Sequence, residues 1–365
     1  MHIVFLAPCA FKLPCGGRKV ILDYINRFIK DGHDVTILYP NYTGIPNSIS
    51  KRKYKFKEIL FLILKYLYYR ITNNYTPHHW YNLNKKVVQK YVWSLSESNA
   101  PKADCYIATG IYTSFYLNCY NIPSTKKFYF IQGFEDWEIG SSPEMVIETF
   151  HFDLNKIVIS SWLQKIIEGE GLKCIKAPNG FNFNEFKYSI DIADRKRYAI
   201  AIMYSENPVK GVSYSLEAID IVKELYPQME VNMFGICPKP DSLPEYFTYY
   251  QNPSKKMLNH IYNNSAIYLT SSINEGWGLT VGEAMMCGCA VVCSDTKGFL
   301  EMATNGYNAL VVPTKNPQAA AKAIIELFED NKLRCQLAEN AIESIRLFDI
   351  ENSYNIFKTE IFKNV

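Results

Sequence analysis

Residues 272–295, with the sequence SINEGWGLTVGEAMMCGCAVVCSD, constrain the fold more than any other stretch of the chain. The short apolar run Ala266–Thr270 precedes them and is typical of a buried parallel strand. A loop with two glycines follows, then good helix formers from Thr280 to Met286, then a second apolar run, Ala290–Cys293. Strand, loop, helix and strand in this order predict a βαβ crossover and therefore a parallel sheet.

The loop of this crossover has the composition of a binding site. Such loops lie at the carboxyl edge of a sheet, where α/β proteins bind ligands. Gly276 and Gly278 allow backbone amides to approach an anion, and a helix N-terminus favours negative charge. Glu275 and Glu283 flank the site; they would repel a phosphate but accept hydrogen bonds from sugar hydroxyls. An anion cradle between two hydroxyl acceptors suits a nucleotide sugar, and the alternative is an acidic helix start with a solvated Glu283.

Length and composition exclude several classes of protein. A chain of 365 residues that is 48% hydrophobic predicts two folded domains and not a disordered protein. A net charge of +3 is too small for a dedicated nucleic-acid-binding protein. The ten cysteines do not suggest a disulfide framework, and Cys287-Gly288-Cys289 has no partner cluster for zinc, so no metal is expected. With no basic leader and no long uncharged run, the reducing cytoplasm is the expected compartment.

The beginning of the chain predicts another parallel sheet. The apolar runs at residues 2–7 and 34–39 flank a helical pattern from Arg18 to Lys30. Gly16-Gly17 lies in the loop before this helix, where the alternative to a ligand contact is an ordinary tight turn. No glycine-x-glycine-x-x-glycine follows the first run, so a nicotinamide-dependent dehydrogenase loses its main support.

Residues 47–96 form an insertion of unusual composition. The apolar run 59–64 is too short to span a bilayer. Residues 51–70 suit a helix lying in the interface of an anionic membrane, where each basic side chain contributes about 1 kcal/mol. A core helix with a solvated, lysine-rich start is an equal alternative. The basic residues ahead of the run are Lys51, Arg52, Lys53, Lys55 and Lys57.

Two further strands, predicted at residues 104–108 and 127–131, end in polar loops. Loops at the carboxyl ends of strands are where a second substrate would bind. The acidic run at 135–138 has no histidine nearby, which favours a solvated loop over a metal site. The polar candidates in these loops are Thr109, Gln132 and Glu135.

The second domain is predicted to begin at residue 198, after a polar, irregular linker at 181–197. Its first strand, Tyr198–Tyr204, is followed by a loop that starts at Ser205 and leads to Lys210-Gly211 and a helix. A lysine beside a helix N-terminus can neutralise a diphosphate, although a solvated loop lysine is the alternative. The next strand ends at Gly235.

The segment Glu275-Gly276-Trp277-Gly278-Leu279, followed by Glu283, resembles the Glu-x7-Glu signature of retaining glycosyltransferases of the GT-B fold, family four. The resemblance covers nearly the whole chain, since Gly16-Gly17 matches the family's glycine loop and Lys210-Gly211 its phosphate-binding lysine. It implies an α/β, GT-B architecture of two Rossmann-like domains facing across a cleft. The implied parts are an acceptor-binding domain at 1–180, a donor-binding domain at 198–347 and a C-terminal helix, 348–365, returning to the first domain.

The resemblance also implies a role for each candidate residue. Glu275 and Lys210 would be catalytic, with Glu275 holding the sugar hydroxyls and Lys210 the diphosphate, while Glu283 would hold the ribose. The chain departs from the family where Ser205 replaces an arginine and Gln132 a histidine, which affects the expected rate and donor preference. The segment around Gln132 is similar to a rhamnosyltransferase-like branch. The remaining implied donor contacts are Gly276, Trp277, Gly278, Leu279, Gly235, Ser205, Gly16 and Gly17, and the acceptor contacts are Thr109, Gln132 and Glu135.

The implied reaction moves a sugar from a nucleoside diphosphate sugar to a hydroxyl of a glycan or lipid-linked oligosaccharide, in lipopolysaccharide or capsule synthesis. No cofactor and no metal are expected, because Lys210, loop amides and a helix dipole can neutralise the diphosphate. The expected partners are donor, acceptor and an anionic membrane contacted through residues 51–70 at the inner face of the cytoplasmic membrane, without nucleic acid. The alternatives are a sugar-nucleotide epimerase or hydrolase of the same architecture, and a sugar-nucleotide-binding protein without catalysis.

Overall fold

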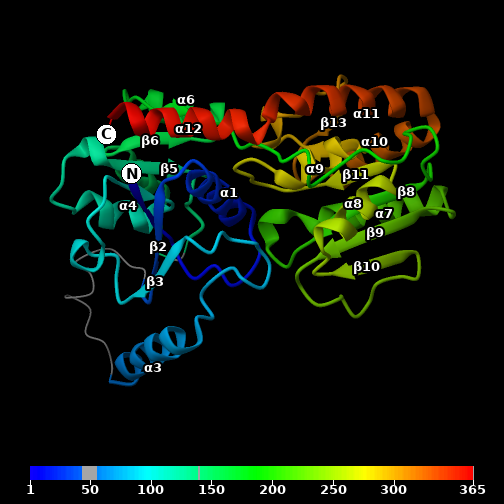
Figure 1. Ribbon diagram of the computed structural model, residues 1–365. Coiled ribbons are helices and arrows are strands. Elements are labelled where there is room, and N and C mark those ends of the chain that lie inside the picture. Colours follow the sequence, from blue (N-terminus) through cyan, green and yellow to red (C-terminus); the bar gives the residue numbers. More distant parts are fainter. Residues whose placement is uncertain (43–55, 139, 365) are drawn as a thin grey trace. The chain divides into compact units, whose positions relative to one another are not determined.

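The computed structural model describes residues 1–42, 56–138 and 140–364, and the chain divides into two compact units (Figure 1). The first unit consists of Met1–Pro178 with Ser353–Val365, and the second of Asn179–Asn352. Each unit contains one sheet whose paired strands all run parallel in the described residues. The predicted α/β class with two parallel sheets is therefore confirmed.

The sheet of the first unit has the strand order β3-β2-β1-β4-β5-β6-β7. Its central strands are buried on both faces, as expected of strands covered by helices on each side. The strands are β1 His2–Leu6, β2 Asp34–Pro40, β3 Val88–Val92, β4 Cys105–Ala108, β5 Lys127–Ile131, β6 Asn155–Val158 and β7 Ile175–Lys176. The helices are α1 Gly16–Lys30, α3 Phe56–Thr72, α4 Ile111–Asn118, α5 Pro143–Phe150, α6 Ser161–Gly169 and α12 Ile350–Asn364, with short 3-10 helices η1 Glu97–Asn99 and η2 Ser124–Lys126.

The sheet of the second unit has the strand order β10-β9-β8-β11-β12-β13. Its strands are β8 Ala199–Tyr204, β9 Glu230–Gly235, β10 Phe247–Gln251, β11 Ile267–Thr270, β12 Ala290–Ser294 and β13 Ala309–Val312. Its helices are α7 Val212–Leu225, α8 Lys255–Asn263, α9 Leu279–Met286, α10 Pro317–Glu329 and α11 Asn331–Ile345, with η3 Pro208–Lys210, η4 Phe299–Glu301 and η5 Arg346–Phe348.

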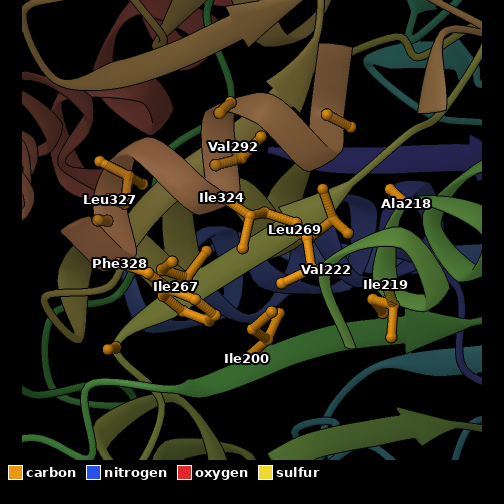
Figure 2. Close-up of a cluster of buried hydrophobic side chains, with 14 of the residues drawn as sticks. Ile200, Ala218, Ile219, Val222, Ile267, Leu269, Val292, Ile324, Leu327 and Phe328 are labelled. Carbon is orange, nitrogen blue, oxygen red and sulfur yellow. The ribbon is translucent and has the colours of Figure 1, made fainter. Parts of the chain in front are cut away.

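The core of the second unit lies between its sheet and the helices α7 and α10. Figure 2 shows Ile200, Ile267 and Leu269 of the strands beside Ile324 and other apolar side chains of α10. All of these side chains are at most 1% exposed. Their burial holds the strand ends, and hence the loops that follow them, in fixed positions.

In both sheets the chain reverses its direction of winding at the centre. In the first unit β1 lies next to β4, and in the second unit β8 lies next to β11. In open parallel sheets the carboxyl edge at such a reversal point is where ligands are most often bound. Each unit therefore has one position where a ligand is most readily bound.

Two strands have no clear signal in the sequence, and both are edge strands. β3 and β10 each pair on one side only, with β2 and β9 respectively. Because one side of an edge strand faces water, polar residues alternate through it and no continuous apolar run appears. The position of β3 also corrects the predicted insertion at 47–96, since residues 88–92 belong to the sheet and Tyr75 is buried in the unit's core.

The predicted linker at 181–197 is wrong, because this segment packs within the second unit. Phe186 and Ile192 are at most 5% exposed, and the amide of Ser189 donates to Oδ1 of Asn263 at 2.8 Å. The buried guanidinium of Arg195 donates to the carbonyl oxygens of residues 262 and 265. A polar, irregular sequence was expected to be solvated, but its polar groups are instead satisfied by backbone carbonyls of the unit.

The C-terminal helix α12 packs in the first unit, as predicted. The ring of Phe357 lies 4.8 Å from that of Tyr24 and 4.9 Å from that of Phe130, measured between centroids. The hydroxyl of Tyr354 donates to Asp31 at 2.8 Å, and Lys358 forms an ion pair with the same carboxylate at 2.6 Å. The chain thus ends in the unit in which it begins.

Candidate functional site

Lys210 and Glu275 form an ion pair at the carboxyl edge of the second unit's sheet. Nζ of Lys210 lies 2.6 Å from Oε1 of Glu275, and the hydroxyl of Ser272 donates to the same oxygen at 3.0 Å. Lys210 ends η3 after β8, and Glu275 lies in the loop after β11, so the pair sits where the winding reverses. The two side chains are 30% and 14% exposed, which leaves them accessible to a ligand.

The loops after β8 and β11 pack against each other through their backbones. Gly211 has a φ of 59°, and a Cβ at this position would lie 2.0 Å from the carbonyl oxygen of Ser271. Only glycine fits such a contact. The amide of Ile273 donates to the carbonyl of Val209 at 2.8 Å and closes the same contact. These interactions hold Lys210 within reach of Glu275.

Gly278 marks the start of α9 and has a φ of 98°. A Cβ there would lie 2.4 Å from the ring of Phe299, so the loop approaches η4 as closely as its backbone allows. No side chain caps α9, and its first turn contains no acidic residue. Gly276, Gly278 and Leu279 therefore lie at a helix N-terminus whose dipole favours an anion.

The side chain of Trp277 serves a structural purpose. It is 3% exposed, and its ring packs edge-on against Phe348 with the centroids 5.3 Å apart. The ring therefore anchors the loop within the unit, its buried Nε1 has no hydrogen-bond partner among the described residues, and a donor contact of the indole stays a prediction. A contact through the backbone of Trp277 stays a prediction.

Glu283 lies on α9 with only 9% of its surface exposed. Its Oε2 accepts a hydrogen bond from the hydroxyl of Tyr262 at 3.2 Å. Burial raises the pKa of Tyr262 well above its ordinary value, and the charge of Glu283 raises it further. The phenol thus stays protonated and donates to the carboxylate, while the predicted ribose contact of Glu283 stays a prediction.

Ser205 and Gly235 lie at the same edge of the sheet as Lys210. Ser205 follows β8 directly, and its hydroxyl accepts from the amide of Asn207 at 3.2 Å. Gly235 ends β9, the neighbour of β8. Both positions agree with donor contacts, but the hydroxyl of Ser205 supplies no positive charge where the related family has an arginine.

Gly17 and Gln132 are neighbours at the carboxyl edge of the first unit's sheet. Gly16 and Gly17 begin α1, so this helix starts two residues earlier than predicted. Gln132 follows β5, and a Cβ on Gly17 would lie 3.3 Å from its Oε1. That oxygen is buried and accepts no hydrogen bond from the residues that the structure describes. A buried acceptor without a donor is unfavourable, and a ligand hydroxyl would satisfy it.

The side chain of Thr109 is buried and links two strands. Thr109 is 2% exposed, and its hydroxyl donates to the carbonyl of Leu6 at 2.7 Å. Its amide donates to the hydroxyl of Thr113 at 2.8 Å. The side chain thus joins β4 to β1 at the point where the winding reverses, and its predicted acceptor contact stays a prediction.

Glu135 binds the N-terminus of α4. Its Oε2 accepts a hydrogen bond from the amide of Ile111 at 2.6 Å. Burial raises the pKa of Glu135 to about 7, the bond from Ile111 lowers it in part, and the charge of Glu138 raises it. A carboxyl group that titrates near neutral pH thus lies in the same loop as Gln132, three residues further along the chain.

We expect the free energy of unfolding to fall between pH 5 and pH 8 because of Glu135. Its pKa is about 7 in the folded chain against an ordinary value of 4.5 for a glutamate side chain, so the folded chain retains a proton that the unfolded chain releases. Unfolding therefore becomes easier as pH rises through this window, by about 2 kcal/mol, and the loss is complete above the folded pKa. Glu135→Gln should remove this dependence in urea unfolding, and Glu148→Gln, at an exposed position on α5, should retain it. Identical pH profiles for wild type and Glu135→Gln would contradict the assignment.

Sequence reasoning missed three contacts of these sites. Ser272 precedes Glu275 by three residues, a spacing within reach of a turn, and this signal could have been used. Tyr262 is 21 residues from Glu283, and only the packing of α8 against the sheet brings them together. The third contact is the hydrogen bond from the backbone amide of Ile111 to Glu135. Any residue type at position 111 other than proline has this amide, so the sequence does not predict the contact.

The residues that the structure describes contain no group of three or more His, Cys, Asp or Glu side chains arranged to hold a metal ion. Among their helices, none combines the length and the apolar content needed to cross a membrane.

Comparison with known proteins gives a family and a fold. Residues 187–344 match the model of the family described as glycosyl transferases group 1. Over 105 residues, 28% of each chain, the protein is 37% identical to an N,N'-diacetylbacillosaminyl-diphospho-undecaprenol alpha-1,3-N-acetylgalactosaminyltransferase of Campylobacter jejuni. Over 245 residues, 58% of this chain and 66% of the other, it is 22% identical to a phosphatidyl-myo-inositol mannosyltransferase of Mycobacterium leprae. The matches thus span less than two thirds of these relatives.

A solved structure extends the likeness to the whole chain. HepE of Anabaena in complex with UDP superimposes with a TM-score of 0.73 over 100% of both chains, at 16% identity. At this identity the likeness shows the fold alone, which is the two-domain GT-B fold. The predicted family and fold are therefore confirmed, whereas the rhamnosyltransferase-like branch stays a prediction. Over residues 187–344, in its second unit, the chain matches the family of group 1 glycosyltransferases.

Proposed function

We propose that the protein is a retaining glycosyltransferase that moves a sugar from a nucleoside diphosphate sugar to a hydroxyl of a glycan or lipid-linked oligosaccharide. The Lys210–Glu275 pair carries this proposal. A diphosphate requires a cation, and a sugar requires a hydrogen-bond acceptor. The pair supplies one of each beside the N-terminus of α9, at the switch point of the sheet.

Donor binding would exchange the partners of this pair. Without a ligand, Lys210 and Glu275 neutralise each other at 2.6 Å. A diphosphate would attract Nζ of Lys210, and a sugar hydroxyl would then donate to the released carboxylate. Ser272 would keep Glu275 in place during the exchange, because its hydroxyl donates to the same oxygen. The site is thus preorganised for both halves of the donor.

In the proposed reaction the bond between the anomeric carbon and the diphosphate oxygen breaks, and its electron pair stays on the diphosphate. The acceptor oxygen bonds to the anomeric carbon on the same face, and its proton passes to the departing phosphate oxygen. Lys210 and the amides at the start of α9 stabilise the developing negative charge. This route requires neither a side-chain nucleophile nor a metal ion.

Gln132 and Glu135 of the first unit are the proposed acceptor contacts. Oε1 of Gln132 is a buried acceptor without a donor, which suits a sugar hydroxyl. The names of the relatives include a substrate linked to diphospho-undecaprenol and a phosphatidyl-myo-inositol, both of which are lipids. Another relative takes part in capsular polysaccharide biosynthesis. These names support a lipid-linked acceptor and surface polysaccharide synthesis, and we propose the inner face of the cytoplasmic membrane as the place of the reaction.

A donor panel tests the proposal. Thermal unfolding is measured with a set of nucleoside diphosphate sugars that includes UDP-glucose, and the matching donor should raise the Tm because it binds only the folded chain. The matching donor is then incubated with and without extracted membrane lipids, in the presence and absence of EDTA. Sugar transfer that needs the lipid extract and survives EDTA is expected. Donor turnover without any acceptor would favour a hydrolase or epimerase, and binding without any product would favour a non-catalytic protein.

A further inference from the structure

Helix α3 exposes an apolar surface that nothing in the described chain covers. Of its 17 residues none is buried. Nine large apolar side chains, here called the outer arc, are 41–80% exposed. In Figure 1 the helix lies at the periphery of the first unit, beyond β3. The outer arc consists of Phe56, Ile59, Leu60, Phe61, Ile63, Leu64, Leu67, Tyr68 and Ile71.

The opposite side of α3 is attached to the unit. Four partly buried residues, Leu62, Lys65, Tyr66 and Tyr69, have the spacing of one helix face. The Tyr69 ring lies 4.9 Å from that of Tyr91 in β3, between centroids, and Nζ of Lys65 donates to the carbonyl of Asn41 at 2.8 Å. Burial accordingly lowers the pKa of Lys65. Because this face is anchored, the outer arc is held outward.

The width of the outer arc indicates what kind of binding partner can cover it. At about 100° per residue, its members span roughly 200° of the helix circumference. A second helix, from another copy of the chain or from a protein partner, covers a seam of two positions in seven and would leave the flanks in water. A lipid interface covers the whole arc at once.

The charges of α3 agree with an anionic lipid surface. Lys57 and Arg70 lie at helical angles within the outer arc, and both are exposed. Glu58 is the one acidic residue in the sequence of α3, and its helical angle places it beside the anchored face. Basic side chains among inserted apolar ones are typical of helices that lie in a membrane interface. The basic residues Lys51, Arg52, Lys53 and Lys55 lie outside the described residues and carry no part of this argument.

The anchor of α3 lies at the edge of the sheet that the acceptor is proposed to use. Asn41 follows β2 directly, and besides accepting from Lys65 its side chain donates to the carbonyl of Leu62 at 3.0 Å. This is the same carboxyl edge from which the chain leads to Gly17 and Gln132. A membrane bound to the outer arc would therefore lie at the acceptor edge of the first unit.

We infer that the outer arc of α3 inserts into the interface of an anionic lipid bilayer and so brings this edge to a membrane-anchored acceptor. Only one part of the inference depends on the proposed function, namely that the acceptor is anchored in a membrane. Insertion relies on apolar burial, so binding persists when salt screens the contribution of Lys57 and Arg70. The helix lies along the surface of the bilayer, because its anchored face stays on β3.

Sedimentation with vesicles tests the inference. Wild-type chain should bind vesicles that contain about a third of phosphatidylglycerol, and should retain most of this binding at high salt. A triple variant with Leu60, Leu64 and Leu67 replaced by Ser should bind on the order of 10- to 100-fold more weakly. The matched control replaces Leu225, Leu300 and Leu347, leucines of the second unit that are 50–77% exposed, by Ser, and should bind as wild type does.

Each outcome of this experiment either supports or overturns the inference. Equal binding of the two triple variants, or no binding of wild type, overturns the inference. Self-association that depends on Leu60, Leu64 and Leu67 in the absence of lipid overturns it too, in favour of a second copy. Circular dichroism and Tm should match between the two variants, so that misfolding is recognised. The UDP-glucose panel on the same variants reports on the second unit, so a failure of donor binding is separate from a failure of membrane binding.

Discussion

Replacement of Glu275 by Gln should lower sugar transfer by about 10²- to 10⁴-fold while the Tm stays within a few degrees of wild type. The amide of Gln can still accept from Lys210 and Ser272, so the loop keeps its hydrogen bonds. What it loses is the negative charge that strengthens hydrogen bonds from the donor's hydroxyls. Glu275→Ala should have at least as large an effect, with Lys210 partly hydrated because it is 30% exposed.

The nucleotide and the sugar can be separated in this experiment. The nucleoside diphosphate of the matching donor lacks the sugar that Glu275 is proposed to hold, so it should raise the Tm of Glu275→Gln at least as much as that of wild type. The further rise produced by the complete donor should be lost. Glu224→Gln on α7, an exposed acid, is the matched control and should behave as wild type. Full transfer activity in Glu275→Gln would refute the assignment of the donor site.

The segment around Glu275 could be predicted from sequence because its signals are local. Buried strands of a parallel sheet are continuous apolar runs, so β11 and β12 stand out on either side of a loop with two glycines. The residue types from Glu275 to Glu283 then restrict the expected ligand to one that carries both an anionic group and hydroxyl groups. No long-range information was needed until Lys210, 65 residues away, had to be placed beside Glu275.

The direction in which a side chain points, toward a ligand or into its own unit, could not be predicted from such local signals. Thr109 and Trp277 have the composition and position of ligand contacts, yet both point into their own units. A polar residue after a strand can bind a ligand or fasten two strands, and a sequence alone does not distinguish these uses. The same holds for residues 181–197, where the partners of Arg195 are backbone carbonyls contributed from elsewhere in the unit.

For the outer arc of α3, the sequence left two predictions open and the structure provided the missing information. Its apolar sequence favoured a core helix and a membrane helix equally, because hydrophobicity alone does not say what covers a surface. The exposure of nine large apolar side chains excludes a core helix within the described chain. The structure thus removes one of the two interpretations, the core helix, and the membrane contact stays an inference.

Phe357→Ala should lower the free energy of unfolding of the first unit by about 3–5 kcal/mol. Phe357 is fully buried, with its ring centroid 4.8 Å from that of Tyr24 and 4.9 Å from that of Phe130. Truncation would leave a cavity between α12, α1 and β5, the strand that carries Gln132. The hydrogen bond and ion pair of α12 with Asp31 would remain, but they are more exposed and contribute less.

The neighbouring residue provides the control for this prediction. Ile356 lies on the same helix but is 40% exposed, so Ile356→Ala should cost less than about 1 kcal/mol. Urea unfolding of wild type and both variants, with and without the matching donor of the panel, measures the difference. The donor is proposed to bind the second unit, whereas the rings that contact Phe357, those of Tyr24, Phe28 and Phe130, lie in the first unit. The step that the donor stabilises should therefore stay in place in Phe357→Ala while the other step moves to lower urea. A shift of both steps together would mean that the two units unfold as one, and an equal response of the two variants would contradict the packing of α12.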